Sequence, residues 1–173
     1  PRVRRQRQMC IRDRIEGMEL GADAYIEKPF SVEYLQACAS NLIQNREKLR
    51  RTFAQSPFVA ANTMALTKAD EDFIKRLNEV ILTNLNNPEF SMDDIADSLN
   101  MSRSNFYRKI KGVLDLSPNE YLRLERLKKA AQLLKQGEGR VTEICYMVGF
   151  NSPSYFAKCF QKQFGVLPKD FVD

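Results

Sequence analysis

The sequence predicts a mainly α-helical protein with two helix-turn-helix motifs joined by one long helix. The main observation is a pattern that occurs twice, offset by 49 residues before its turn and by 50 after it. Each copy describes two short helices joined by a tight corner, with a serine opening the second helix. No convincing strand pattern follows Phe30. The repeated positions are Ile95, Ala96, Leu99, Asn100, Met101, Phe106 and Ile110, then Ile144, Cys145, Val148, Gly149, Phe150, Phe156 and Phe160.

Two segments of different character precede the repeat. Residues 1–14 are rich in arginine and show no periodicity, so we expect a disordered leader, whose native origin is open. A nucleic-acid-binding arm is the alternative for this segment. Residues 15–52 predict a truncated α/β fragment, with a helix end closed by Gly21 and a short strand at residues 24–26.

A further helix is expected after Ser31, which is a suitable N-cap residue. It carries apolar residues at spacings of three and four, which is typical of a core-facing seam or of a dimeric coiled coil. Both alternatives stay open at this point. Residues 53–69 contain Ser56-Pro57 and little periodicity, and they predict a linker. The apolar stripe consists of Val32, Leu35, Ala39, Leu42, Leu49 and Phe53.

From Asp70 onward the pattern is helical. A first helix presents Phe73, Ile74, Leu77, Ile81 and Leu85 on one face and ends before Asn86-Asn87-Pro88. Ser91 and Ser102 are the expected N-caps of the two helices of the first motif. Asn100 occupies the corner between them, where asparagine tolerates a left-handed backbone.

The central helix is predicted over residues 118–136. Ser117-Pro118-x-Glu120 forms a capping box with proline at the first helical position, and Gly137 ends the helix.

The second motif begins near Thr142. Gly149 takes the corner place, because glycine adopts a left-handed backbone without steric cost. Ser152-Pro153 opens the last long helix, which ends at Gly165.

Composition excludes several classes of protein. The chain has no histidine, no C-x-x-C pair among its four cysteines and no phosphate-binding glycine loop, so we expect no metal, no cofactor and no catalytic site. Cys145 and Cys159 are expected to be small core residues, with a redox switch as the alternative. No apolar stretch reaches the roughly 18 residues of a membrane span. We therefore expect a cytoplasmic location, while a longer parent protein with a membrane anchor stays open.

Positive charge gathers in the C-terminal half of the chain. Residues 100–137 hold nine basic side chains against three acidic ones, and residues 144–169 hold three lysines and no acid. This distribution suits a polyanionic partner, although a solvated charged surface explains it as well.

The second helix of each motif buries one face and leaves the other for a partner. Phe106 and Ile110 point inward in the first motif, and Phe156 and Phe160 do so in the second. The outward mixture of short polar, small and basic side chains suits a DNA groove better than an apolar interface. Any single position can also be an exposed polar residue without a partner. The candidate DNA-contacting residues are Arg103, Ser104, Asn105, Tyr107, Arg108 and Lys111, then Ser152, Ser154, Ala157, Lys158 and Gln161.

Residues 70–173 resemble the DNA-binding domain of the AraC/XylS family of transcription regulators. The family implies seven helices in two helix-turn-helix subdomains that are joined by a long central helix. It places base-reading side chains at Ser104, Tyr107, Arg108, Ser154, Ala157 and Lys158. Pro153 departs from the polar residue that some members have there. The motifs that carry this resemblance are Ser91–Ala96, Met101–Lys111, Ser117–Leu127, Ile144–Phe160 and Phe164-Gly165-x-x-Pro168.

Residues 15–52 resemble the C-terminal end of a response-regulator receiver domain. The resemblance is carried by Gly21-Ala22-Asp23-Ala24-Tyr25-Ile26-x-Lys28-Pro29-Phe30. It implies that Lys28 contacts the phosphoryl group, that the bond before Pro29 is often cis, and that the phospho-accepting aspartate lies upstream. A receiver followed by an AraC-type domain resembles the output end of a hybrid two-component sensor.

The expected function is therefore sequence-specific transcriptional regulation as the output of a two-component phosphorelay. The expected partners are double-stranded promoter DNA and, in the full-length form, a second copy of the protein, with RNA polymerase as a further candidate. The receiver and kinase portions are expected to lie upstream of this chain. The alternative is a helical protein-interaction module that does not read DNA.

Overall fold

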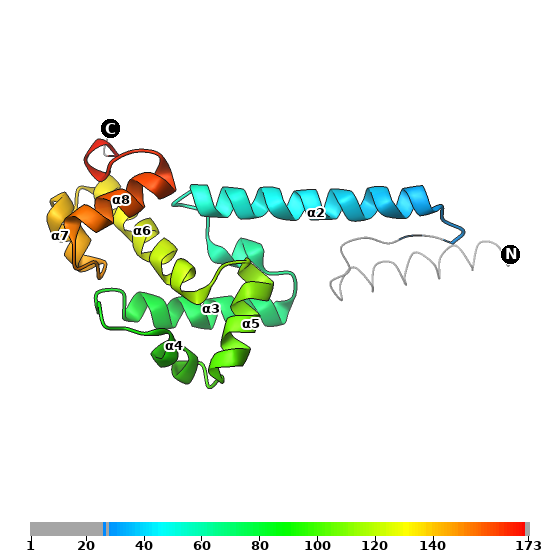
Figure 1. Cartoon of the computed structure of the whole chain (residues 1–173), viewed down its shortest axis with the longest axis horizontal. Helices are drawn as coiled ribbons and strands as arrows, with labels where there is room; N and C mark the ends of the chain where they lie inside the picture. Colours follow the sequence, from blue (N-terminus) through cyan, green and yellow to red (C-terminus); the bar gives the residue numbers. More distant parts are fainter. Residues whose placement is uncertain (1–25, 27, 172–173) are drawn as a thin grey trace, which may run out of the picture. The chain divides into compact units, whose positions relative to one another are not determined.

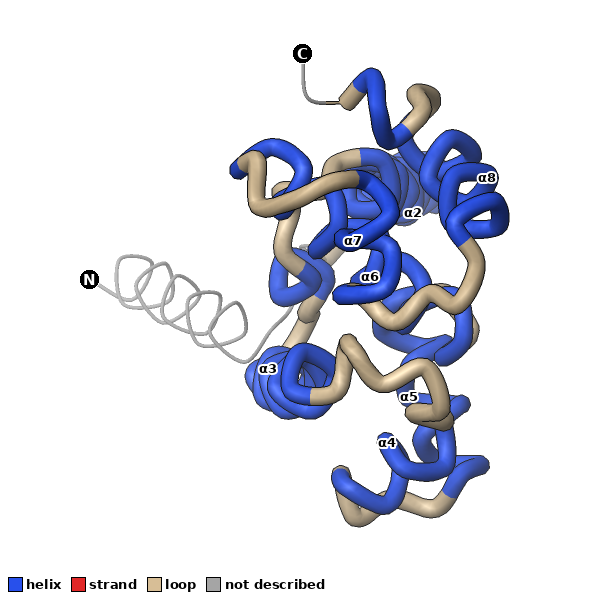
Figure 2. The backbone as a smooth tube through the Cα atoms, turned by 90° about the vertical axis from the view of Figure 1, so that its left-hand side faces the viewer, coloured by secondary structure: helices blue, strands red, loops and turns tan. Residues whose placement is uncertain are grey.

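The computed structural model describes residue 26 and residues 28–171. The expected leader, the helix end before Gly21 and all but the last residue of the expected strand lie outside these residues. The chain divides into two compact units, Pro1–Lys48 and Leu49–Asp173, which are described separately. Within the described residues the secondary structure is entirely helical (Figures 1 and 2), which confirms the mainly α fold class. No helix in this part of the chain has the length and apolar character needed to cross a membrane.

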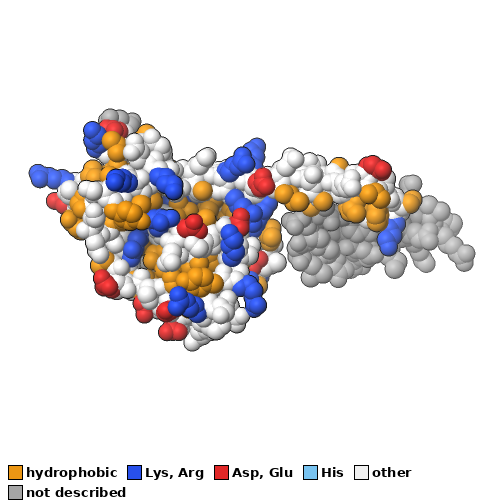
Figure 3. Space-filling view, in the orientation of Figure 1, with side chains coloured by type: hydrophobic (Ala, Val, Ile, Leu, Met, Phe, Trp, Pro, Cys, Tyr) orange, Lys and Arg blue, Asp and Glu red, His pale blue; other side chains and the backbone are white. Residues whose placement is uncertain are grey.

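Helix α2 spans Val32–Gln55 and begins where the sequence predicts. The hydroxyl Oγ of Ser31 accepts a hydrogen bond from the backbone N–H of Tyr34 at 3.1 Å, as an N-cap does. Before the helix, the Lys28–Pro29 peptide bond is cis. The apolar stripe of α2 is largely exposed from Val32 to Leu49, and only Phe53 at its C-terminal end is buried. Figure 3 shows apolar side chains at the surface along α2.

The segment predicted as a linker, residues 53–69, differs from that expectation. Phe53, Ala61 and Met64 are buried in the first hydrophobic core, and the short 3-10 helix η1, Ala61–Met64, packs against α3 and α5. Its apolar residues are too irregularly spaced to show a helical period. They nevertheless fill the space beside α3, so this segment is part of the C-terminal unit.

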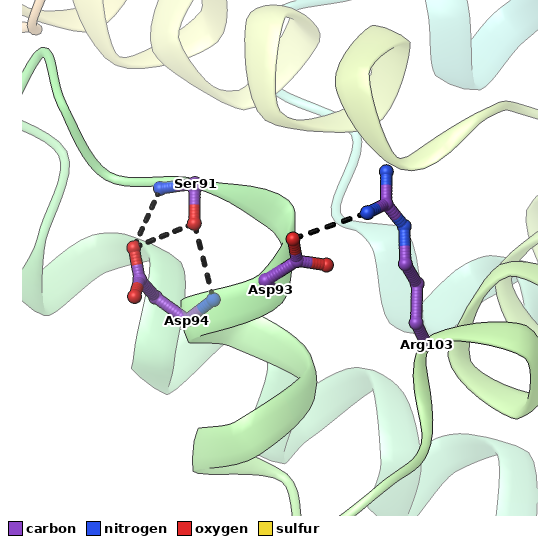
Figure 4. A network of polar contacts seen from close by, with 4 residues as sticks. All are labelled: Ser91, Asp93, Asp94 and Arg103. Atoms are coloured by element: carbon purple, nitrogen blue, oxygen red, sulfur yellow. Dashed lines mark hydrogen bonds and ion pairs between the residues drawn. The ribbon is translucent and has the colours of Figure 1, made fainter.

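The first motif consists of α4, Met92–Ser98, and α5, Arg103–Leu114, preceded by α3, Lys68–Thr83. The predicted caps are confirmed. Ser91 and Asp94 form a capping box, in which the Asp94 carboxylate accepts from the Ser91 backbone N–H at 2.9 Å (Figure 4). Ser102 accepts from the backbone N–H of Asn105.

The central helix α6 spans Pro118–Gln136, as predicted, and the capping box of Ser117 and Glu120 opens it. The second motif consists of α7, Val141–Met147, and α8, Pro153–Phe164. A short 3-10 helix η2, Pro168–Asp170, follows. The seven helices implied by the family resemblance correspond, within residues 68–170, to the six α-helices α3–α8 and to η2.

Two separate hydrophobic cores meet along α6. The first contains buried residues up to Leu124, and the second begins at Leu127. Figure 1 shows α6 running from the neighbourhood of α3 and α5 to that of α7 and α8. The central helix is therefore the one helix that contributes buried residues to both of these cores.

Candidate nucleic-acid interface

The corners of the two motifs have the same backbone geometry. Asn100 has φ 54° and Gly149 has φ 79°, both in the left-handed region that the sequence predicts. After each corner the chain makes an equivalent hydrogen bond, from Met101 N to Ala96 O at 2.9 Å and from Phe150 N to Cys145 O at 3.0 Å. These atoms are related by the 49-residue offset of the repeat, so the duplicated pattern produces a duplicated structure.

The helices that follow the corners, α5 and α8, are called the recognition helices from here on. Phe106, Ile110, Phe156 and Phe160 are all buried, as predicted. No candidate DNA-contacting residue is buried, and Tyr107 and Ala157 are the two that are half-buried. The remaining candidates are exposed: Arg103, Ser104, Asn105, Arg108, Lys111, Ser152, Ser154, Lys158 and Gln161.

Each cationic candidate on α5 contacts an acceptor within the protein. Arg103 Nη1 lies 3.2 Å from Asp93 Oδ2 on α4 (Figure 4), and its guanidinium carbon lies 5.5 Å from the centroid of the Tyr107 ring. Arg108 Nη2 donates to Asn105 Oδ1 at 2.8 Å.

Lys111 pairs with Asp115 at 3.0 Å. The Lys111 hydrogen bond, followed by the charge of Arg50, lowers the pKa of the Asp115 carboxyl, so Asp115 stays anionic. All these pairs are exposed, so each stabilises the fold little.

The recognition helix α8 is built differently. Ser152 Oγ accepts the backbone N–H of Tyr155 at 3.3 Å, so this hydroxyl acts as the N-cap. Lys158 is exposed, and among the described residues its side chain makes no hydrogen bond or ion pair. The half-buried Ala157 presents only an apolar surface.

A groove of about 600 Å³ lies between the two motifs. Arg103 and Tyr107 of α5 line one wall, and Ser152 and Tyr155 of α8 line the other. The N-terminal ends of both recognition helices therefore open onto the same groove. Figure 2 shows α5 and α8 on one side of the domain and α3 on the other.

The floor of this groove comes from α6 and from the second corner. Arg123 and Arg126 of α6 line it together with Gly149 and Asn151. Arg126 is half-buried, and burial lowers its pKa from the ordinary value, although an arginine keeps its charge. On the face drawn in Figure 3, Lys and Arg side chains are interleaved with apolar patches.

Sequence reasoning missed several residues at this site. Asp93 and Arg126 belong to the motifs of the family resemblance, but their contacts join residues 10 and 39 positions apart. Tyr155 and Arg123 sit on outward helix faces, where only the placement of the opposite motif makes them part of a groove. No periodicity in the sequence signals such a placement.

Cys145 is a small core residue, as the sequence predicts. Its side chain is buried, its thiol donates to Phe150 O at 3.7 Å, and burial raises its pKa away from the reactive thiolate form. Cys159 is half-buried beside the second core.

Comparison with known proteins identifies the domain. Residues 95–173 match the family described as "Helix-turn-helix domain". The chain is 35% identical over 158 residues to Histidine kinase P4 of Formosa agariphila, covering 91% of this chain and 12% of the kinase. The chain spans between 12% and 33% of the length of the first curated relatives that it matches.

Solved structures share this fold. The C-terminal domain of AraT, a response regulator from Geobacillus stearothermophilus, is 31% identical with a TM-score of 0.52, over 57% of this chain and 81% of that one. The DNA-binding domain of AdpA, a global transcriptional factor in complex with a target DNA, is 27% identical with a TM-score of 0.50, over 56% and 89%. Domains of this kind are not enzymes. Through its C-terminal unit, the chain belongs to the AraC-type helix-turn-helix family of transcription regulators.

Proposed function

We propose that this chain is the sequence-specific DNA-binding end of a longer transcription regulator. The observation that carries the proposal is the shared groove, because it opens at the N-terminal ends of both recognition helices. Helices placed in this way enter successive major-groove segments about 34 Å apart on one face of the duplex. The similarity to the AdpA domain in complex with DNA supports the same arrangement.

The candidate side chains have different roles in this proposal. Arg108 and Lys158 approach base edges or phosphates, whereas Arg103, Lys111 and Gln161 flank them and add backbone contacts. Ser104, Asn105, Tyr107, Ser154 and Ala157 complete the reading surface, and Ser152 holds the start of α8.

The test is DNA binding by Arg108→Ala and Lys158→Ala, measured against duplexes selected from random sequence by the unaltered protein. We expect each variant to lose about tenfold or more in affinity for the selected duplex. Lys75→Ala removes an exposed cation from α3, away from the groove, and is the matched control. Unchanged affinity and specificity in both variants would contradict the proposal.

A helical protein-interaction module is the alternative function. Salt titration separates the two, because DNA binding through several phosphate contacts weakens steeply as salt rises. Binding to DNA that is weak and insensitive to salt favours the alternative.

The finer role that we propose is the output step of a two-component phosphorelay. The match of 91% of this chain to Histidine kinase P4 supports it, as does the similarity to the response regulator AraT. In this proposal Lys28 and Pro29 are remnants of a receiver switch, the parent protein acts as a homodimer in the cytoplasm, and RNA polymerase is a partner. Replacing the phospho-accepting aspartate of the upstream receiver should abolish signal-dependent transcription from a reporter.

A further inference from the structure

The placement of the two recognition helices depends on how the two cores are joined. The buried residues of the two cores form separate clusters. Along α6, Leu124 belongs to the first cluster and Leu127 to the second. A single helix contributes buried residues to both cores, so every further contact between the motifs adds to what holds them in place. The contacts that bridge the motifs on either side of this point therefore decide how far apart α5 and α8 lie.

The first bridge is made by Arg126. Its Nη2 donates to Asn87 O at 2.8 Å, in the loop that connects α3 to the first motif. The corner of the second motif packs on the same guanidinium. A Cβ atom placed on Gly149 would lie 3.0 Å from Arg126 Cζ and 2.3 Å from Leu85 O, which shows how closely the two backbones approach.

The second bridge lies on the opposite face of α6, because positions 126 and 128 are about 200° apart around a helix. Lys128 is 4% exposed, and its Nζ donates to Val59 O at 2.7 Å and lies 3.6 Å from the centroid of the Phe53 ring. These partners belong to the first core or pack against it.

Residues 53–59 are also tied to the second recognition helix. Gln163 Nε2, near the C-terminal end of α8, donates to Ala54 O at 2.7 Å. The C-terminal end of α2 and the segment that follows it therefore contact both the central helix and α8, from the side of the first core.

We propose that Arg126, Lys128 and Gln163 set the spacing between the DNA segments that the two motifs read. They are positioning residues, since they act through the placement of α5 and α8. The inference rests on the proposed function, because spacing has meaning only if both motifs bind DNA. None of these three bridging contacts was expected from the sequence, and each joins residues at least 39 positions apart.

The test uses the whole chain and a duplex selected from random sequence by the unaltered protein. One or two base pairs are added or removed between its two half-sites, and affinity is measured for each spacing. Each added base pair rotates one half-site by about 35° and moves it by about 3.4 Å. The variants are Arg126→Gln, Lys128→Met and Gln163→Ala. Lys129→Met is the control, because it removes one charge from α6 and, among the described residues, its side chain makes no hydrogen bond or ion pair.

We expect the unaltered protein and the control to lose about tenfold in affinity for a one-base-pair change of spacing. Each bridge variant should reduce this discrimination to about threefold or less, or move the preferred spacing by one base pair. A variant that is merely less stable weakens binding at every spacing by the same factor, and chemical unfolding of each variant measures that contribution.

The outcomes separate the two proposals. If all three bridge variants keep the spacing profile of the unaltered protein, the inference is wrong while the proposed function stands. If the unaltered protein binds no sequence preferentially, or binds all spacings equally, the proposed reading by two motifs fails and the inference fails with it.

Discussion

The two helix-turn-helix motifs have the same backbone geometry at their corners but differ in charge. In the first motif Asp93 and Asp115 hold Arg103 and Lys111. In the second motif no acidic residue occurs between positions 144 and 169. Both motifs therefore have the same corner geometry and a serine as the N-cap of the recognition helix. The charges around the two recognition helices differ.

The cores differ as well. The first is built mainly from aliphatic side chains and carries three fully buried aromatic rings, those of Phe53, Phe106 and Tyr121. The second stacks aromatic rings around Phe160, whose centroid lies 5.7 Å from that of Phe156, 4.8 Å from Phe164 and 5.3 Å from Phe171. Removing one ring from such a cluster deprives several neighbours of contacts at once.

The largest expected effect is a loss of stability in the second core. Phe160→Ala should lower the free energy of unfolding by about 3–5 kcal/mol, because it empties the centre of the aromatic cluster. Ile110→Ala, at the equivalent place in the first motif, should cost about 2–5 kcal/mol. Urea unfolding gives the energies, and amide hydrogen exchange gives the location. Because the cores are separate, protection should fall first in α7 and α8 for one variant and in α3–α5 for the other. An equal loss of protection in both motifs would contradict the separation.

The next effect compares the two corners. Gly149→Ala should cost about 3 kcal/mol or more, since a left-handed alanine costs about 1–2 kcal/mol and its Cβ would also displace the Leu85 carbonyl. Asn100→Ala should cost only about 1 kcal/mol, because asparagine already carries a Cβ in this backbone conformation. Thermal unfolding of both variants checks the order, and a larger cost at Asn100 would show that the close approach at Gly149 is not the controlling factor.

A smaller effect concerns the helix between the motifs. Burial lowers the pKa of Lys128 to about 8 from an ordinary value of 10.5, against the opposing effect of the Glu125 charge. Between these values the unfolded chain holds a proton that the folded protein has lost, so stability rises with pH in that window. The free energy of unfolding should therefore shift by about 1–3 kcal/mol in favour of the unaltered protein over Lys128→Met between pH 7 and pH 10.

Tyrosine titration affects both of these proteins, so the difference between them isolates Lys128. Urea unfolding at several pH values measures it. A difference that stays constant with pH would mean that Lys128 is neutral throughout or remains protonated at pH 10.

The smallest expected effect is on DNA affinity, from a substitution that makes the charge of the first motif resemble that of the second. Asp93→Asn should release Arg103 and raise DNA affinity by about twofold to fivefold at low salt, with a smaller gain at high salt. Asp97→Asn removes the same charge from α4 without breaking an ion pair and serves as the control. Equal gains in both variants would indicate a general charge effect in place of the Arg103 pair.

Much of this architecture could be predicted from the sequence because it is encoded locally. Ser91, Ser102, Ser117 and Ser152 cap the helices that they were expected to cap, and α6 has the predicted bounds. A cap, a proline at the first helical position and a left-handed corner each depend on a few adjacent residues.

The features that could not be predicted depend on distant residues. Met64 and Ala61 lie in a segment without periodicity, and they are buried because α3 and α5 leave a space that this segment fills. The groove, the Asp93–Arg103 pair and the Arg126 bridge appear only once the motifs are placed against each other. The apolar stripe of α2 has helical spacing, and the segment is a helix. The spacing alone did not show whether the stripe would be buried.

The shared use of α6 has a consequence for how the domain opens. Its N-terminal half contributes Tyr121 and Leu124 to one core, and its C-terminal half contributes Leu127 and Leu134 to the other. Backbone amides near Glu125 become accessible to solvent only when the packing on both sides is lost, so they should be among the slowest to exchange. Local opening that starts at either end of the domain therefore stops at the middle of this helix, and complete unfolding requires the loss of both halves together.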